Sequence, residues 1–144
     1  MRRRKLALAL LASFVWSSAM AQSPTAFTVT SPAFEDGGLL SKRNGGAGDC
    51  GGENISPPIA WRNVPQGAKS FAIIMYDPDG QKGLGSVHWV AYDIPSDRRE
   101  LPEGAGTDPA AALVGGTNTR QLKTYFGPCP PQGDALHHLA DIAP

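Results

Sequence analysis

The chain has 144 residues, 41% of them hydrophobic, and its thirteen basic and thirteen acidic residues give a formal net charge of zero at pH 7. Four of the basic residues lie within the first five positions, so the chain after Ala21 carries nine basic and thirteen acidic residues, a net charge of about −4. This balance excludes general nucleic-acid binding, which requires a basic face against the phosphates, and the length allows one domain but not two.

The first 21 residues have the pattern of a secretory signal peptide. Basic residues at positions 2–5 precede an apolar run from Leu6 to Trp16, and Ala19 and Ala21 place small side chains at the expected cleavage site. The apolar run is too short to span a bilayer, which disfavours the alternative of an uncleaved membrane anchor. We therefore expect cleavage after Ala21, a periplasmic or secreted protein, and one domain over residues 22–144 without a transmembrane span.

Several later segments are predicted β-strands between loops rich in Gly and Pro. Residues 27–30 alternate weakly, residues 71–76 form a continuous apolar run typical of a strand buried on both faces, and residues 87–94 are β-branched and aromatic. Residues 44–52 and 104–116 are predicted loops, the second with a helical turn at its centre. The pattern predicts an all-β fold, an antiparallel, Greek-key-like sandwich with long loops and little helix.

Two polar residues stand at neighbouring strand ends. Asp77 follows the apolar strand directly and precedes Pro78, and His88 lies near the start of the next strand. A carboxylate and an imidazole placed there can share a hydrogen bond, which leaves the other ring nitrogen facing a ligand. The alternatives are a turn built by the aspartates of Asp77-Pro78-Asp79 and a half-buried structural histidine.

The two cysteines, Cys50 and Cys129, are predicted to enter an oxidising compartment, which favours an intramolecular disulfide. Two buried thiols are the alternative, and a catalytic thiol near the pair His137-His138 is a third interpretation. A metal site is disfavoured because neither cysteine has a ligand at C-x-x-C spacing.

Six segments, in order, carry a more specific signal. They are residues 27–34 (FTVTSPAF), 50–61 (CGGENISPPIAW), 64–71 (VPQGAKSF), 76–79 (YDPD), 88–95 (HWVAYDIP) and 127–131 (GPCPP). Together they resemble the phosphatidylethanolamine-binding protein family, specifically its bacterial, Raf-kinase-inhibitor-like branch. The resemblance covers nearly all of residues 27–138.

The resemblance implies a β-sandwich with a shallow pocket for a phosphate or a phospholipid headgroup. Asp77, His88 and His137 match the family's pocket residues, and Gly127 and Pro128 begin the segment that matches the pocket wall, which often includes a cis proline. Imidazolium and backbone N–H donors would bind the anion, and the carboxylate would hold the imidazoles or receive an ammonium group. The resemblance also implies a Cys50–Cys129 disulfide, no catalysis, no cofactor or metal, and a protein partner such as a kinase or a protease.

Three departures from the family pattern stand out. Leu139 replaces a pocket tyrosine, and residues 80–87 lack an Ala-Pro pair and a tryptophan. After His138 the family continues with an apolar strand and a helical stretch, where this chain has only residues 139–144. We therefore expect an incomplete domain from a truncated or frameshifted gene, with the C-terminal strand and helix missing and one sheet edge open.

Three alternatives to anion binding are kept. One is a weak phosphoester hydrolase with Asp77, His88 and His137 as acid and base. A second is a metal-binding module through His88, His137, His138 and Asp79, although their spacing matches no known metal motif. The third is a nonfunctional fragment.

Overall fold

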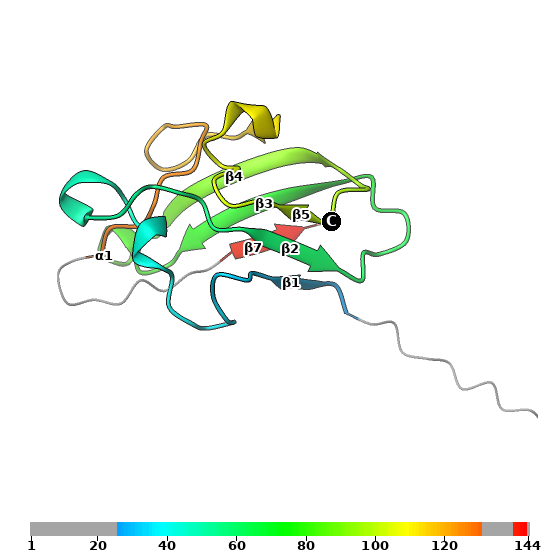
Figure 1. Cartoon of the computed structure of the whole chain (residues 1–144), viewed down its shortest axis with the longest axis horizontal. Coiled ribbons are helices and arrows are strands. Elements are labelled where there is room, and N and C mark those ends of the chain that lie inside the picture. Colours follow the sequence, from blue (N-terminus) through cyan, green and yellow to red (C-terminus); the bar gives the residue numbers. More distant parts are fainter. Residues whose placement is uncertain (1–25, 131–139, 144) are drawn as a thin grey trace, which may run out of the picture.

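The computed structural model describes residues 26–130 and 140–143, which form two antiparallel sheets (Figure 1). One sheet has the order β1-β2-β5, made of β1 (Thr28–Thr30), β2 (Ile59–Arg62) and β5 (Glu100–Leu101). The other has the order β6-β4-β3-β7, made of β3 (Ser70–Asp77), β4 (Ser86–Pro95), β6 (Val114–Gly115) and β7 (Ala140–Ala143). Helix within these residues is confined to α1 (Gly80–Gly83) and the 3-10 turns η1 (Lys42–Asn44), η2 (Gly48–Cys50) and η3 (Pro109–Ala111). The predicted all-β fold with two antiparallel sheets is confirmed.

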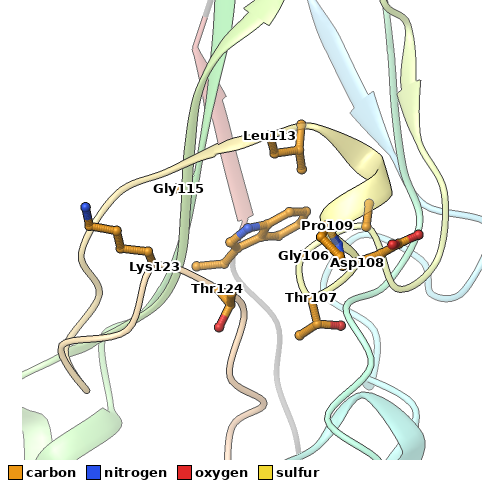
Figure 2. A pocket seen from close by; sticks show the side chains of 10 residues that line it. Gly106, Thr107, Asp108, Pro109, Leu113, Gly115, Lys123 and Thr124 are labelled. Atoms are coloured by element: carbon orange, nitrogen blue, oxygen red, sulfur yellow. The ribbon is translucent and has the colours of Figure 1, made fainter.

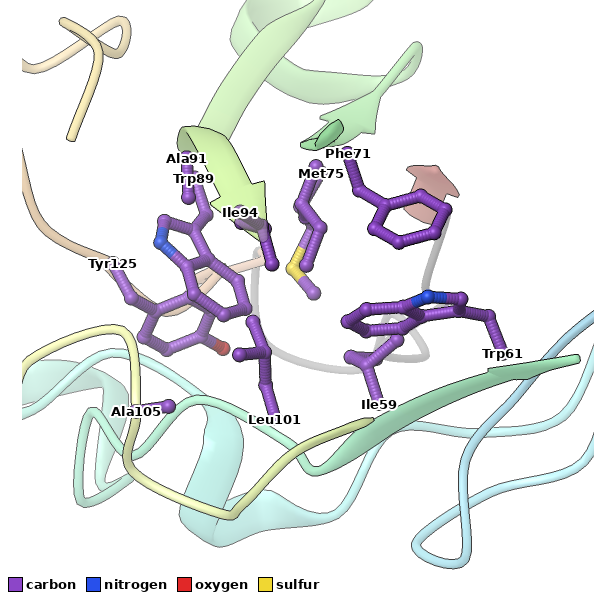
Figure 3. Close-up of a cluster of buried hydrophobic side chains, with 11 residues drawn as sticks. Ile59, Trp61, Phe71, Met75, Trp89, Ala91, Ile94, Leu101, Ala105 and Tyr125 are labelled. Carbon is purple, nitrogen blue, oxygen red and sulfur yellow. The ribbon is translucent and has the colours of Figure 1, made fainter. Parts of the chain in front are cut away.

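The hydrophobic core lies between the two sheets. Ile59 and Trp61 enter it from β2, whereas Phe71 and Met75 enter it from β3 and Trp89 from β4 (Figure 3). The rings of Trp61 and Phe71 are tilted, with their centroids 5.1 Å apart. Burying each large side chain of this kind contributes about 1.5–3 kcal/mol, so this layer supplies much of the force that joins the sheets.

Strand β3 is buried on one face only, which corrects the prediction from its apolar run. Phe71, Ile73 and Met75 are buried, but Ile74 is 46% exposed and Tyr76 is 40% exposed. Successive side chains of a strand point to opposite faces, and only the inner face of this sheet meets the three-stranded sheet. A continuous apolar run therefore does not distinguish a strand with one open face from one covered on both sides.

The outer edge of β3 is paired along four residues, which corrects the expectation of an open edge there. The backbone of Ala140–Ala143 runs antiparallel to β3, in a register from Met75 opposite Ala140 to Ala72 opposite Ala143. An edge strand presents unpaired N–H and C=O groups that any extended segment can bind. The expectation of an open edge came from the family strand that is missing after His138, whereas this pairing needs only an extended backbone.

A disulfide joins two distant loops, as predicted. Cys50, at the end of η2, is bonded to Cys129 across 79 residues of sequence, with the Cα atoms 5.4 Å apart. The loop around Cys50 has no strand from Thr30 to Ile59, so it depends on such cross-links for its position. The predicted helical turn in the second long loop is η3, whose first turn is capped by the Asp108 carboxylate accepting from the Ala110 N–H.

Within residues 26–130 and 140–143, no helix is long and apolar enough to cross a bilayer. The predicted signal peptide, residues 1–21, lies outside the described residues.

We expect the double variant Cys50→Ala/Cys129→Ala to lose about 4–5 kcal/mol of unfolding free energy, because a bond across a loop of this length restricts the unfolded chain. Urea unfolding of the oxidised protein, the reduced protein and the double variant measures this. The reduced protein should match the variant, and the variant should not respond to reductant. Equal midpoints for all three would contradict a stabilising disulfide.

Candidate functional site

Asp77 is held at the end of β3 by a local turn. Its Oδ1 accepts the backbone N–H groups of Asp79 (3.0 Å) and Gly80 (3.1 Å). A Cβ at Gly80 would lie 2.6 Å from the Ser86 Cβ and 3.1 Å from the Asp77 Oδ2, so only glycine allows this close approach. The turn fixes the carboxylate, so the interpretation of Asp77 as a turn residue and its interpretation as a site residue are compatible.

His88 is directed to the same place by an irregularity in the β3–β4 pairing. Trp89 lies opposite Met75 and Val87 lies opposite Tyr76, so His88 is the extra residue of a bulge. A bulge lets two consecutive side chains escape the strict alternation of a strand. Both His88 and Trp89 are accordingly buried.

The imidazole of His88 has one satisfied nitrogen and one unsatisfied nitrogen. Nδ1 lies 3.1 Å from the Phe126 carbonyl oxygen, which can only accept, so Nδ1–H is the donor. Nε2 lies 3.7 Å from the Asp77 Oδ2, which is ion-pair range but too long for a hydrogen bond. Nε2 is buried and has no hydrogen-bond partner among the described residues. The structure therefore brings Asp77 and His88 close together, but the predicted hydrogen bond between them is not formed. The nitrogen without a partner is the one that faces Asp77, because the other nitrogen is bonded to Phe126.

Burial favours the neutral form of the His88 ring in the ligand-free protein. Desolvation lowers the pKa of His88 below its usual 6.5, and the nearby Arg120 lowers this pKa further. The Phe126 carbonyl and the Asp77 carboxylate raise this pKa without overcoming desolvation. His88 is thus not the ready imidazolium donor that the resemblance implied, because burial disfavours its charged form.

Gly127 and Pro128 form a buried wall that is fastened to the loop around η1. The Gly127 N–H donates to the Asn54 Oδ1 (2.7 Å), and the Pro128 carbonyl accepts the Gly46 N–H (2.9 Å). A Cβ at Gly127 would lie 2.5 Å from the Gly46 nitrogen, so the contact requires glycine. The Gly127 N–H is already engaged, so the wall supplies shape rather than the backbone donor that we expected. All peptide bonds of the described residues are trans, so the implied cis proline is not found among them.

A buried asparagine that the sequence analysis missed holds the segment before this wall. The Asn118 Nδ2 donates to the carbonyls of His88 (3.2 Å) and Thr124 (2.8 Å), and its Oδ1 accepts the N–H groups of Arg120 and Leu122, each at 3.0 Å. An asparagine in a loop after two glycines was a turn signal, but only the fold shows that its amide reaches β4.

The sequence pattern also did not indicate the aromatic ring of Phe126 and the cation of Arg120 beside His88. The Phe126 ring packs on the imidazole with a centroid distance of 4.5 Å, and the Arg120 guanidinium carbon lies 5.2 Å from the Phe126 centroid. Neither residue lies in a motif that suggests binding. Their proximity to His88 depends on how the loop after β6 folds back along β4.

His137, predicted as a third pocket residue, lies outside the described residues, as do His138 and Leu139. Their places in the site remain predictions. Among the residues that the structure describes, no group of three His, Cys, Asp or Glu side chains could hold a metal ion.

A separate hollow of about 140 Å³ lies between the loop that contains η3 and the segment after β6 (Figure 2). Trp89, Pro109 and Leu113 contribute apolar surface to it, and Lys123 and Asp108 lie on opposite sides of it. None of the predicted site residues that the structure describes lines this hollow. It is therefore distinct from the pair formed by Asp77 and His88.

Comparison with known proteins identifies relatives of this chain. The model of a family described as phosphatidylethanolamine-binding protein matches residues 30–140. The Escherichia coli protein YbcL is 37% identical over 140 residues, which cover 94% of this chain and 75% of YbcL. The crystal structure of YbcL, described as a new member of the mammalian PEBP family, matches with a TM-score of 0.73 at 36% identity, over 81% of this chain and 74% of that one.

More distant relatives give the same result. LppC of Mycobacterium tuberculosis, which carries a lipoprotein name, is 35% identical over 114 residues, or 77% of this chain and 51% of LppC. The chain spans from about half to three quarters of the length of these relatives. The family model covers most of the chain and YbcL exceeds 30% identity, so the chain belongs to the phosphatidylethanolamine-binding protein family.

Proposed function

We propose that the protein binds a small anion, such as a phosphate or a phospholipid headgroup, at the site formed by Asp77 and His88. One observation carries the proposal: the His88 Nε2 is buried, lacks a partner among the described residues, and faces the Asp77 Oδ2 at 3.7 Å. Native proteins rarely leave a buried polar atom unpaired. Such an atom between two strand ends favours a ligand that completes its hydrogen bonding.

The chemistry of the pair suggests which ligands fit. A neutral His88 with its proton on Nδ1 presents a lone pair at Nε2, and the Asp77 carboxylate presents another acceptor. Because the His88 Nε2 and the Asp77 carboxylate are both hydrogen-bond acceptors, they can be bridged only by a hydrogen-bond donor or by an added proton. A phosphomonoester brings a hydroxyl group or promotes uptake of a proton by the ring, and an ethanolamine headgroup brings an ammonium. The family name, phosphatidylethanolamine-binding protein, combines both groups in one ligand.

The proposal extends to location and partners. Residues 1–21 would direct export, and the lipoprotein name of LppC and the Cys50–Cys129 disulfide support an exported or envelope protein. His137 would complete the pocket, with residues 22–144 acting as one domain. The bound protein would modulate a protein partner such as a kinase or a protease, as the family resemblance implies, and would not act as an enzyme.

We expect millimolar phosphoethanolamine to raise the thermal unfolding temperature. A ligand at a hundred times its Kd stabilises the folded state by about 2.7 kcal/mol. His88→Ala should abolish the shift, whereas Thr107→Ala, an exposed substitution beside the separate hollow, should retain it. Ethanolamine and inorganic phosphate serve as separate arms that identify the recognised group.

Other outcomes of this experiment would overturn the proposal. Wild-type protein that unfolds cooperatively without any shift does not bind the anion, and a chain without a cooperative transition is a nonfunctional fragment. Phosphoester turnover that His88→Ala abolishes would support the hydrolase alternative. Zinc that survives dialysis at one ion per chain would support the metal-binding alternative.

We also expect anion binding to weaken as the pH rises. Burial lowers the pKa of His88 in the free protein below 6.5, and a bound anion would raise it, so binding takes up a proton. Affinity should be greatest below the pKa of the free protein and should fall by up to about tenfold per pH unit above it. Isothermal titration with sulfate, which does not itself titrate between pH 5 and 8, measures this dependence. The His88→Gln variant should lose it, and equal pH profiles for both proteins would contradict proton uptake by His88.

A further inference from the structure

We infer that Arg120 supplies the positive charge that selects anions at the site formed by Asp77 and His88. The inference rests on the proposed function, because it assigns a specificity-determining residue to that same site. Arg120 belongs to none of the segments that carry the family resemblance, and it acts from a loop outside the strands.

The Phe126 ring lies between the Arg120 guanidinium and the His88 ring, in contact range of both. The Arg120 guanidinium carbon lies 5.2 Å from the centroid of the Phe126 ring, and that ring lies 4.5 Å from the His88 ring. The guanidinium carbon is therefore no more than 9.7 Å from the centre of the imidazole. This separation is about one Debye length at 0.1 M salt, so the charge acts on a group bound at His88.

The backbone of Arg120 is fixed relative to His88, although its side chain is exposed. The Arg120 N–H donates to the Asn118 Oδ1 (3.0 Å), and the Asn118 Nδ2 donates to the His88 carbonyl (3.2 Å). One buried amide thus links the two residues directly. The fixed backbone and the cation–π contact with Phe126 together limit the conformations of the Arg120 side chain.

Anion binding at Asp77 and His88 would be favoured by a nearby cation. Asp77 contributes a carboxylate that repels anions, and burial lowers the pKa of His88 and favours its neutral form. Within the described residues, Arg43 is paired with Glu53 and Glu103, whereas no carboxylate is paired with Arg120.

The positive charge of Arg120 affects both the protonation of His88 and the choice of ligand. Arg120 already lowers the pKa of His88, so its field reaches the ring. An anion beside His88 would reduce this repulsion between the two cationic groups and so favour protonation of the ring. The site should therefore prefer a phosphate or another compact anion to a neutral or purely cationic headgroup.

The test compares Arg120→Gln, Arg120→Lys and Arg62→Gln with the wild type. Arg62 is exposed at the end of β2 in the other sheet, so its variant removes the same charge elsewhere. Isothermal titration with inorganic phosphate at 20 and 200 mM salt measures the affinity. We expect Arg120→Gln to weaken binding about three- to tenfold at low salt and to reduce the salt dependence, with Arg120→Lys retaining most of the affinity. Arg62→Gln should stay within about twofold of the wild type.

A second readout separates charge from a merely structural role. Histidine NMR titration should show a higher pKa for His88 in Arg120→Gln, and a value in Arg120→Lys close to that of the wild type. Wild-type protein that binds phosphate, with Arg120→Gln binding equally and with the same salt dependence, would overturn the inference and leave the proposed function intact. Wild-type protein that binds neither phosphate nor phosphoethanolamine would overturn the proposed function, and the inference with it. Wild-type protein that binds phosphoethanolamine but no phosphate would overturn the inference alone. If Arg120→Gln does not fold, weak binding by a folded Arg120→Lys with unchanged salt dependence would also contradict a role for the charge.

Discussion

The bulge between β3 and β4 determines what the candidate site contains. With uninterrupted alternation, His88 and Trp89 would point to opposite faces of the sheet. The extra residue turns both inward, so that Trp89 fills the core while His88 meets the carboxylate at the end of β3. The core and the site are therefore built by adjacent residues, and moving the bulge by one position would separate them.

Two asparagine side chains organise the loops around that pair. Asn118 holds the segment before the wall against β4, and Asn54 holds the wall itself through the Gly127 N–H. Both use amides to satisfy backbone groups where no strand continues, as buried loops must. The Cys50–Cys129 disulfide also links the wall segment to the loop that contains η2. The wall is thus positioned by many small constraints rather than by one regular element.

Desolvation sets the electrostatic character of the site. A histidine exposed at a strand end would be partly protonated near neutral pH and would bind anions directly. Burial against Phe126 disfavours that charge, so under the proposed function the affinity for an anion would come from proton uptake or from a cation nearby. Under that proposal, binding would respond to pH and to salt in ways that binding to a permanently charged pocket does not. The hollow beside Trp89 is lined by neither Asp77 nor His88 and is a separate feature of the fold.

Much of the protein could be predicted from its sequence, because the signals were local or formed an ordered set. The strands at 71–76 and 87–94, the disulfide, and the placement of Asp77 and His88 at neighbouring strand ends all followed from residue type and spacing. The open outer face of β3, the neutral state of His88 and the engagement of the Gly127 N–H did not. The same holds for the pairing of Ala140–Ala143 with β3 and for the stack of Arg120 on Phe126. Composition and pattern determine which segments form strands and which groups are available for chemistry. Only the tertiary structure decides which groups lose their solvent and which donors find partners, because burial and hydrogen bonding depend on segments far apart in the chain.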